Sequence, residues 1–142
     1  TFVRRDGRAL RPAMLWNDGR AHIECGELER GQPRLRAITG NRAMAGFTAP
    51  KVLWVARHEP AVLEATWTVL LPKDFVRHRL SGDFATDLSD ASGTLWLDVG
   101  ARSWSPGLVA ACGLDPSRMP MLHEGSSITG TVAASAAEEL GI

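Results

Sequence analysis

The sequence predicts a mixed domain of helices and strands, of the α/β or α+β class, because segments of helical and of strand character alternate along the chain. The chain has 142 residues, enough for one domain with a substantial core or for a piece of a larger domain. Hydrophobic residues make up 44% of the chain and charged residues 23%, a composition typical of globular rather than disordered proteins.

Charge and hydropathy argue against two classes of partner. The 16 basic and 16 acidic side chains give a formal net charge of zero, and Lys and Arg form no cluster, so we expect no nucleic-acid partner. No apolar run approaches the ~18 residues needed to span a membrane, so we expect no membrane partner. Residues 1–6 lack the apolar segment of a signal peptide, and the chain does not begin with Met, so we expect a processed product or an internal piece of a longer protein.

The chain has two cysteines, Cys25 and Cys112, which lie far apart and form no Cys-x-x-Cys pattern. This usage predicts reduced thiols in a cytoplasmic protein. The sequence does not decide whether the two cysteines form a disulfide, because pairing depends on geometry that a sequence does not show. The four histidines are scattered and none has zinc-ligand spacing to another ligand, so we expect no metal site.

Turn and cap patterns predict the elements of the first third. Residues 3–14 are expected to form a hairpin with Asp6-Gly7 in its turn. A helix over residues 20–30 follows, and the Asp18 carboxylate can accept a backbone N–H of its first turn. Residues 32–46 have mixed character.

Prolines mark the starts of most later helices. Proline lacks a backbone N–H, and in the first helical turn that N–H would have no partner within the helix. The helices expected there cover residues 50–57, 60–64 and 72–80, and one from Ser105-Pro106 to Gly113. A last helix is expected over residues 133–140.

Two segments have strand character. Residues 65–71 are apolar and β-branched, as in a buried strand. In residues 94–99, apolar side chains alternate with others, which predicts a strand with one buried face. The apolar set is Leu95, Leu97 and Val99.

Residues 46–58 carry the most specific pattern: Gly-Phe-Thr-Ala-Pro-Lys-Val-Leu-Trp-Val-Ala-Arg-His. The pattern resembles the first signature of the FGGY carbohydrate kinases, in which a small or aromatic residue precedes Thr, Lys and an apolar-x-Trp-apolar helix. Further blocks resemble the same family in the same order: residues 10–20, 38–41, 70–75, 87–94 and 124–126. Within the family, they are most similar to bacterial members that act on D-xylulose.

The resemblance implies a ribonuclease-H-like domain of the actin and hexokinase type, with a mixed sheet and flanking helices. Residues 1–142 would be part of the N-terminal domain, without the C-terminal domain that holds ATP. The family's first phosphate loop and the Met-His-Gly segment that touches the sugar are not in the sequence. The catalytic Asp of the Gly-Gly-Gly-Asp-Asn segment would follow Ile142, so we expect no catalytic residue in this chain.

The implied activity is ATP-dependent phosphorylation of D-xylulose to D-xylulose 5-phosphate by a cytoplasmic full-length enzyme that uses ATP and Mg²⁺. The chain alone is expected to be inactive. One alternative is a sister kinase that acts on another ketose or polyol, such as ribulose, gluconate or glycerol. Another is a non-catalytic interaction module. The sequence does not decide whether the protein forms a homo-oligomer.

Trp16 and Asp18 are the candidate sugar-binding residues, because the resemblance places both near the sugar side of the cleft. The face of a Trp side chain packs on the C–H surface of a sugar, and a carboxylate accepts hydrogen bonds from hydroxyl groups. The alternatives are that Trp16 belongs to the core and that Asp18 only caps a helix.

Lys51 and Trp54 are expected to serve packing rather than chemistry. Val52, Val55 and Ala56 lie on one apolar stripe of the predicted helix. The long stem of Lys51 can bridge two elements. Some relatives carry a sugar-binding Arg where this chain has Gly46, so the resemblance does not supply that contact. Residues 87–94 are rich in short polar side chains and fit a cleft-lining loop and a structural turn equally well.

Overall fold

The structure is a computed structural model that describes residues 1–142, and it confirms the predicted mixed α/β class. Its α-helices are α1 (His22–Gly31), α2 (Leu35–Thr39), α3 (Thr48–His58), α4 (Pro60–Ala65), α5 (Pro72–Ser81), α6 (Leu88–Ser92), α7 (Pro106–Ala111) and α8 (Ala134–Leu140). The strands are β1 (Phe2–Val3), β2 (Thr68–Val69), β3 (Ala85–Asp87), β4 (Leu97–Asp98), β5 (Ser103–Trp104) and β6 (Met121–His123). A 3-10 helix, η1, spans Pro116–Arg118.

The strands form three separate two-stranded sheets. β1 and β2 are antiparallel, with Phe2 opposite Val69. β4 and β5 are also antiparallel, whereas β3 and β6 are parallel, with Thr86 opposite Leu122. Each strand therefore has a partner on one side only, except β1, which also pairs with residues 9–10 through a bridge between Val3 and Ala9.

The hydrophobic core draws on β1, β2, α1, α3 and α7. Trp96 is among the largest fully buried side chains, and its indole N–H donates a hydrogen bond of 3.3 Å to the sulfur of Cys112. Val52 and Val55 on α3 are completely buried, so the predicted apolar stripe does pack on the core.

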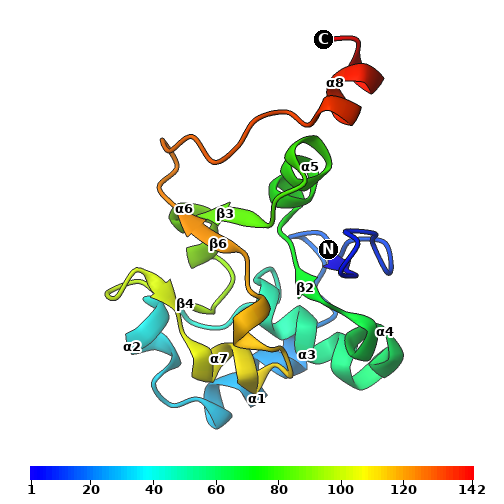
Figure 1. Cartoon of the computed structure of the whole chain (residues 1–142). Helices are drawn as coiled ribbons and strands as arrows, with labels where there is room; N and C mark the ends of the chain where they lie inside the picture. Colours follow the sequence, from blue (N-terminus) through cyan, green and yellow to red (C-terminus); the bar gives the residue numbers. More distant parts are fainter.

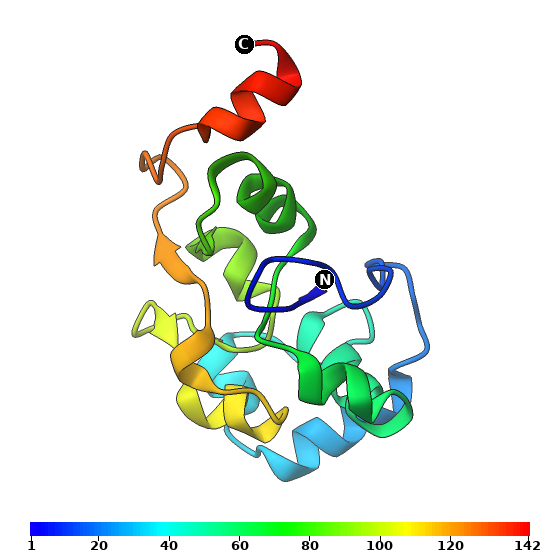
Figure 2. The same cartoon turned by 45° about the vertical axis from the view of Figure 1, so that its right-hand side comes forward.

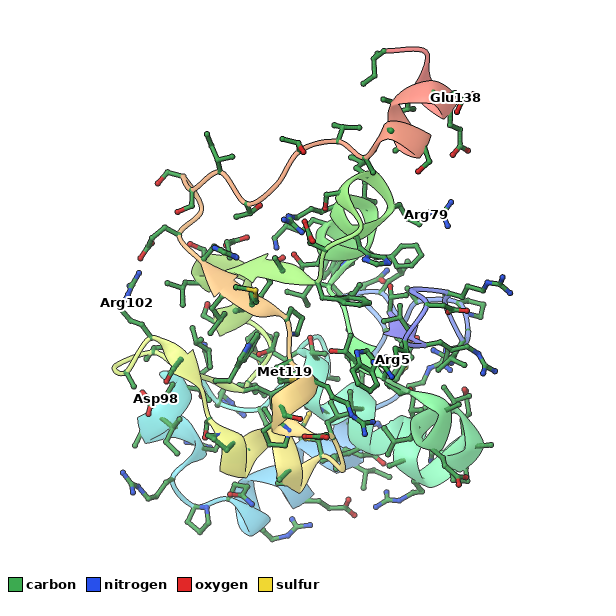
Figure 3. The ribbon with its side chains drawn as sticks, viewed as in Figure 1. Arg5, Arg79, Asp98, Arg102, Met119 and Glu138 are labelled. Carbon is green, nitrogen blue, oxygen red and sulfur yellow. The ribbon has the colours of Figure 1, made fainter.

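The elements form two groups with β2 between them (Figure 1). α1, α2, α3, α4 and α7 gather in one group, and α5, α6, β3 and β6 in the other. A turned view shows the C-terminal helix α8 at the far end, after an extended segment (Figure 2). The backbone N–H of Ala133 donates to the carbonyl oxygen of Leu80 at 2.8 Å, which attaches the start of α8 to α5. The exposed side chains of Arg102 and Glu138 extend outward from the body (Figure 3).

Most predicted helices are present with small differences at their ends. α1, α3, α4, α5, α7 and α8 correspond to the six segments predicted as helical. The predicted hairpin has its turn, in which the N–H of Gly7 donates to the carbonyl oxygen of Arg4 at 3.0 Å. The hairpin is shorter than predicted, because its pairing ends with the hydrogen bond from Leu10 to Phe2.

The two strand predictions are wrong in extent. Within residues 65–71 only β2 is a strand, since α4 continues to Ala65. Within residues 94–99 only β4 is a strand, because Leu95 has a left-handed φ of +67° that interrupts the extended backbone. The predicted alternation is absent as well, since Leu95 and Leu97 are buried but Val99 is exposed.

Six elements were not predicted from the sequence: α2, β3, α6, β5, η1 and β6. α2 has five residues and ends at Gly40, which adopts a left-handed φ of +68°. β3 and β6 have three residues each and pair across a long sequence separation. Short parallel pairs give little local signal, because their hydrogen bonds all join distant segments.

Two further expectations concern thiols and membranes. Cys25 and Cys112 are both free, so the open possibility of a disulfide between them is not realised. No helix has both the length and the apolar character that crossing a bilayer would require.

Candidate functional site

A cavity of about 310 Å³ lies between the loop that precedes α1, the start of α3 and the segment that joins β2 to α5. Its lining combines apolar and aromatic side chains with a few polar ones, the composition typical of small-molecule sites. The aromatic members include Trp16 and Phe47, and the polar members include Thr48, Lys51 and Asp90.

Trp16 lines this cavity and is 82% exposed, so the alternative that it belongs to the core is wrong. An exposed indole leaves a large apolar face in contact with water, and such faces mark binding surfaces when they border a cavity. The side chain is therefore free to contact a ligand.

Asp18 lies outside the cavity lining and does not cap α1. The residue before α1 is Ala21, and no side chain caps that helix. The Asp18 carboxylate instead accepts hydrogen bonds from Arg20, from Nε at 2.9 Å and from the backbone N–H at 3.1 Å. These hydrogen bonds hold the pKa of the Asp18 carboxyl below its usual range, so it is ionised at neutral pH.

Lys51 bridges the two loops that face each other across the cavity wall. Its Nζ donates to the carbonyl oxygen of Leu15 at 2.7 Å and to that of Gly46 at 2.8 Å. The residue is buried, and this burial lowers the pKa of its ammonium. The bridging role expected for its long side chain is thus observed.

Gly46 approaches the backbone of Trp16 more closely than any other residue type could. A Cβ at position 46 would lie 2.9 Å from the carbonyl oxygen of Trp16. The absence of a side chain at Gly46 therefore allows the two loops to meet beside Lys51.

The polar run of residues 87–94 combines both roles considered for it. Asp87 caps α6, because its carboxylate accepts the backbone N–H of Asp90 at 2.9 Å. Lys73 joins Asp87 and Asp90, at 2.9 and 3.3 Å, and also pairs with the buried Asp74. Asp90 lines the cavity as well, so the segment is at once a structural turn and part of the wall.

Sequence reasoning missed Phe47, Thr48 and Asp90 as lining residues. Phe47 and Thr48 stand inside the motif of residues 46–58, which could have indicated them. Asp90 stands inside the polar run of residues 87–94, for which a cleft-lining role was one of two expectations, but the sequence did not single it out within that run.

The chain offers no donor set for a metal ion. No group of three or more His, Cys, Asp or Glu side chains is arranged to hold one. The carboxylates of Asp90, in the lining, and of Asp18, two residues after Trp16, are each bound by a basic side chain.

The family comparison covers the whole chain. Residues 1–142 match the model of the FGGY family of carbohydrate kinases, N-terminal domain. The xylulose kinase of Escherichia coli K12 is 52% identical over 142 residues, which are 100% of this chain and 29% of that protein. The xylulose kinase of Bacillus subtilis is 39% identical over 139 residues, which are 97% of this chain and 28% of that protein.

Solved structures agree with the sequence comparisons. A xylulose kinase from Rhodospirillum rubrum matches 99% of this chain and 29% of its own with a TM-score of 0.93 at 31% identity. A kinase from Brucella ovis, described as a "xyloylose kinase", gives a TM-score of 0.94 at 47% identity over 100% of this chain and 29% of its own. These neighbours confirm the predicted fold class, that of the actin- and hexokinase-like sugar kinases.

Proposed function

This chain belongs to the FGGY family of carbohydrate kinases, and we propose that it is part of the N-terminal domain of an enzyme that phosphorylates D-xylulose. The chain-long similarity to xylulose kinases, 52% identical in one case, is the observation that supports this substrate most strongly. The chain spans 29% of the length of that relative. The proposal therefore concerns the activity of the full-length protein.

The cavity supports a role in sugar binding. Its volume of about 310 Å³ is at the lower end of the range for small-molecule sites. Trp16 offers an apolar face to the C–H surface of a sugar, and Thr48 and Asp90 supply oxygen atoms for its hydroxyl groups.

Asp18 is the second sugar-binding residue of the proposal. Arg20 holds its carboxylate in one orientation and keeps it ionised, which suits the acceptance of hydroxyl hydrogen bonds. Asp18 does not line the cavity, so its contact requires the sugar to extend toward the loop that carries Trp16.

The reaction we propose transfers the γ-phosphoryl group of ATP to a sugar hydroxyl. Such transfer depends mainly on the positions of the reactants and on charge stabilisation. In this scheme the residues of this chain bind and orient the sugar and keep water from one side of it. This chain has no group of three or more side chains that could hold a metal ion, and we assign the sites of ATP and Mg²⁺ and the catalytic base to the remainder of a cytoplasmic enzyme.

The test is an ATP-dependent phosphorylation assay of the full-length protein with D-xylulose, D-ribulose, gluconate and glycerol. We expect the highest kcat/KM with D-xylulose. A higher value with another compound would identify a sister kinase, and no turnover with any of them would contradict the kinase assignment. Residues 1–142 alone are expected to release ADP no faster than a blank without protein.

A further inference from the structure

One of the three N–H donors of the Lys51 ammonium has no hydrogen-bond partner in the chain. Lys51 is 6% exposed, so little of its surface contacts solvent. Two N–H groups are taken by the carbonyl oxygens of Leu15 and Gly46. A protonated lysine has three donors, and no other acceptor in the chain bonds to this one.

Lys51 also has no ionic partner. It takes part in no ion pair, and the charge of Asp18 raises its pKa only enough to offset part of the effect of burial. The other lysine of the chain, Lys73, is paired with three carboxylates, those of Asp74, Asp87 and Asp90. A buried cation without a carboxylate is costly, so Lys51 retains a strong demand for one more acceptor.

The residue with this unused N–H donor lines the cavity. Lys51 lines the cavity, and so do Leu15 and Gly46, the residues whose carbonyl groups it binds. The ionised side chains of the lining are Lys51 and Asp90, whose formal charges cancel. A lining without net charge suits a neutral polyhydroxy compound better than a sugar acid.

We propose that Lys51 is a substrate-binding residue whose third N–H donates to a hydroxyl oxygen of the sugar. The inference rests on the proposed function, because it names a contact to the same substrate. Lys51 then has two tasks, since it also fixes the backbone immediately before Trp16 and immediately before Phe47.

The first measurement is the KM for D-xylulose and for ATP in the full-length protein with Lys51→Met, which keeps the length of the side chain and removes its donors. We expect the KM for D-xylulose to rise about tenfold or more, as for the loss of a hydrogen bond to a charged group, with little change for ATP. Lys51→Arg, which retains charge and donors, is expected to recover part of the affinity.

The second measurement separates a sugar contact from a purely structural role. Monodeoxy analogues of D-xylulose each lack one hydroxyl group. In the wild-type protein, the analogue without the hydroxyl that meets Lys51 should bind more weakly than D-xylulose. In Lys51→Met this difference should vanish. In Lys51→Arg, which also serves should the first variant not fold, the difference should shrink but remain, because the donors are kept in another geometry.

Arg57→Met is the matched control. Arg57 pairs with the buried Glu24 at 2.7 Å, away from the cavity, so its loss should lower Tm without a change in the KM for D-xylulose. If Lys51→Met, like Arg57→Met, lowered Tm and left the KM for D-xylulose unchanged, the inference would be overturned. If the wild-type protein phosphorylated no sugar, the proposed function would fail first and this inference with it.

Discussion

Arg20 fixes the carboxylate of Asp18 through both its side chain and its backbone. Nε lies 2.9 Å and the backbone nitrogen 3.1 Å from Oδ1, while Nη2 lies 2.9 Å from Oδ2. The guanidinium carbon of Arg20 also lies 4.9 Å from the ring centroid of Trp54, within the range of a cation–π contact. Asp18 is thus held in place by a residue of α3 through Arg20, and not by the start of α1.

This arrangement leads to a prediction for Asp18→Ala in the full-length protein. If Asp18 binds the sugar, the change should raise the KM for D-xylulose about tenfold or more, with the KM for ATP unchanged. Steady-state kinetics with each substrate varied in turn measures both values. Asp6→Ala, which removes an exposed ion pair with Arg8, is the control and should change neither. An unchanged KM for D-xylulose in Asp18→Ala would remove Asp18 from the proposed site.

Gly46→Ala tests the close contact between the two loops. The new methyl group would lie 2.9 Å from the carbonyl oxygen of Trp16, so the loops must move apart. Overpacking of this kind costs about 1–3 kcal/mol, and here it should weaken D-xylulose binding as well as lower Tm. Gly19→Ala is the control, because a Cβ there would meet nothing within 4 Å. Equal behaviour of the two variants would argue against a role for this contact.

Asp87→Ala tests the cap of α6. Loss of the capping carboxylate should lower the free energy of unfolding by about 1 kcal/mol at neutral pH, and Asp87→Asn should cost less because its amide oxygen can still cap. Denaturant unfolding of the full-length protein and its variants measures the difference.

The cost of Asp87→Ala should also depend on pH. The backbone N–H of Asp90 and the ammonium of Lys73 lower the pKa of Asp87 below its ordinary value of 3.8. The stabilisation is therefore complete above that ordinary value and is lost as the pH falls through the lower pKa of the folded state. A difference between wild type and Asp87→Ala that stayed constant on acidification would contradict this assignment.

The isolated 142-residue chain is expected to self-associate. Every strand except β1, whose second edge pairs with residues 9–10, has a partner on one side only, and large apolar side chains such as Met121 and Ile128 are 67% and 94% exposed. Unpaired strand edges and apolar surface both promote association. Light scattering on the purified chain should therefore detect oligomers, whereas a monodisperse monomer with cooperative unfolding would show a self-sufficient domain.

Helices were predictable from this sequence because their signals are local. Pro60, Pro72 and Pro106 each stand in the first turn of an observed helix, and Gly82 ends α5 with a left-handed φ of +83°. These residues act through their own backbone geometry, so no knowledge of the rest of the fold is needed.

Strands and the cavity were less predictable because they depend on distant partners. Leu95 looked like a strand residue, yet it adopts a left-handed φ and is fully buried. Trp16 was predicted for the sugar site through the family resemblance, and the structure places it at a cavity. Asp90 lines the same cavity, and the polar run of residues 87–94 suggested a cleft-lining role without identifying this residue.

Binding of D-xylulose to the full-length protein with Trp16→Ala, measured by calorimetry, tests the sugar-binding role of this cavity most directly. Because Trp16 is 82% exposed, its loss should leave Tm unchanged, so weaker binding could not be attributed to unfolding. We expect the Kd for D-xylulose to rise about fivefold or more, from the loss of about 1 kcal/mol of aromatic contact, while the Kd for ATP stays the same. An unchanged Kd for D-xylulose would show that the sugar binds elsewhere.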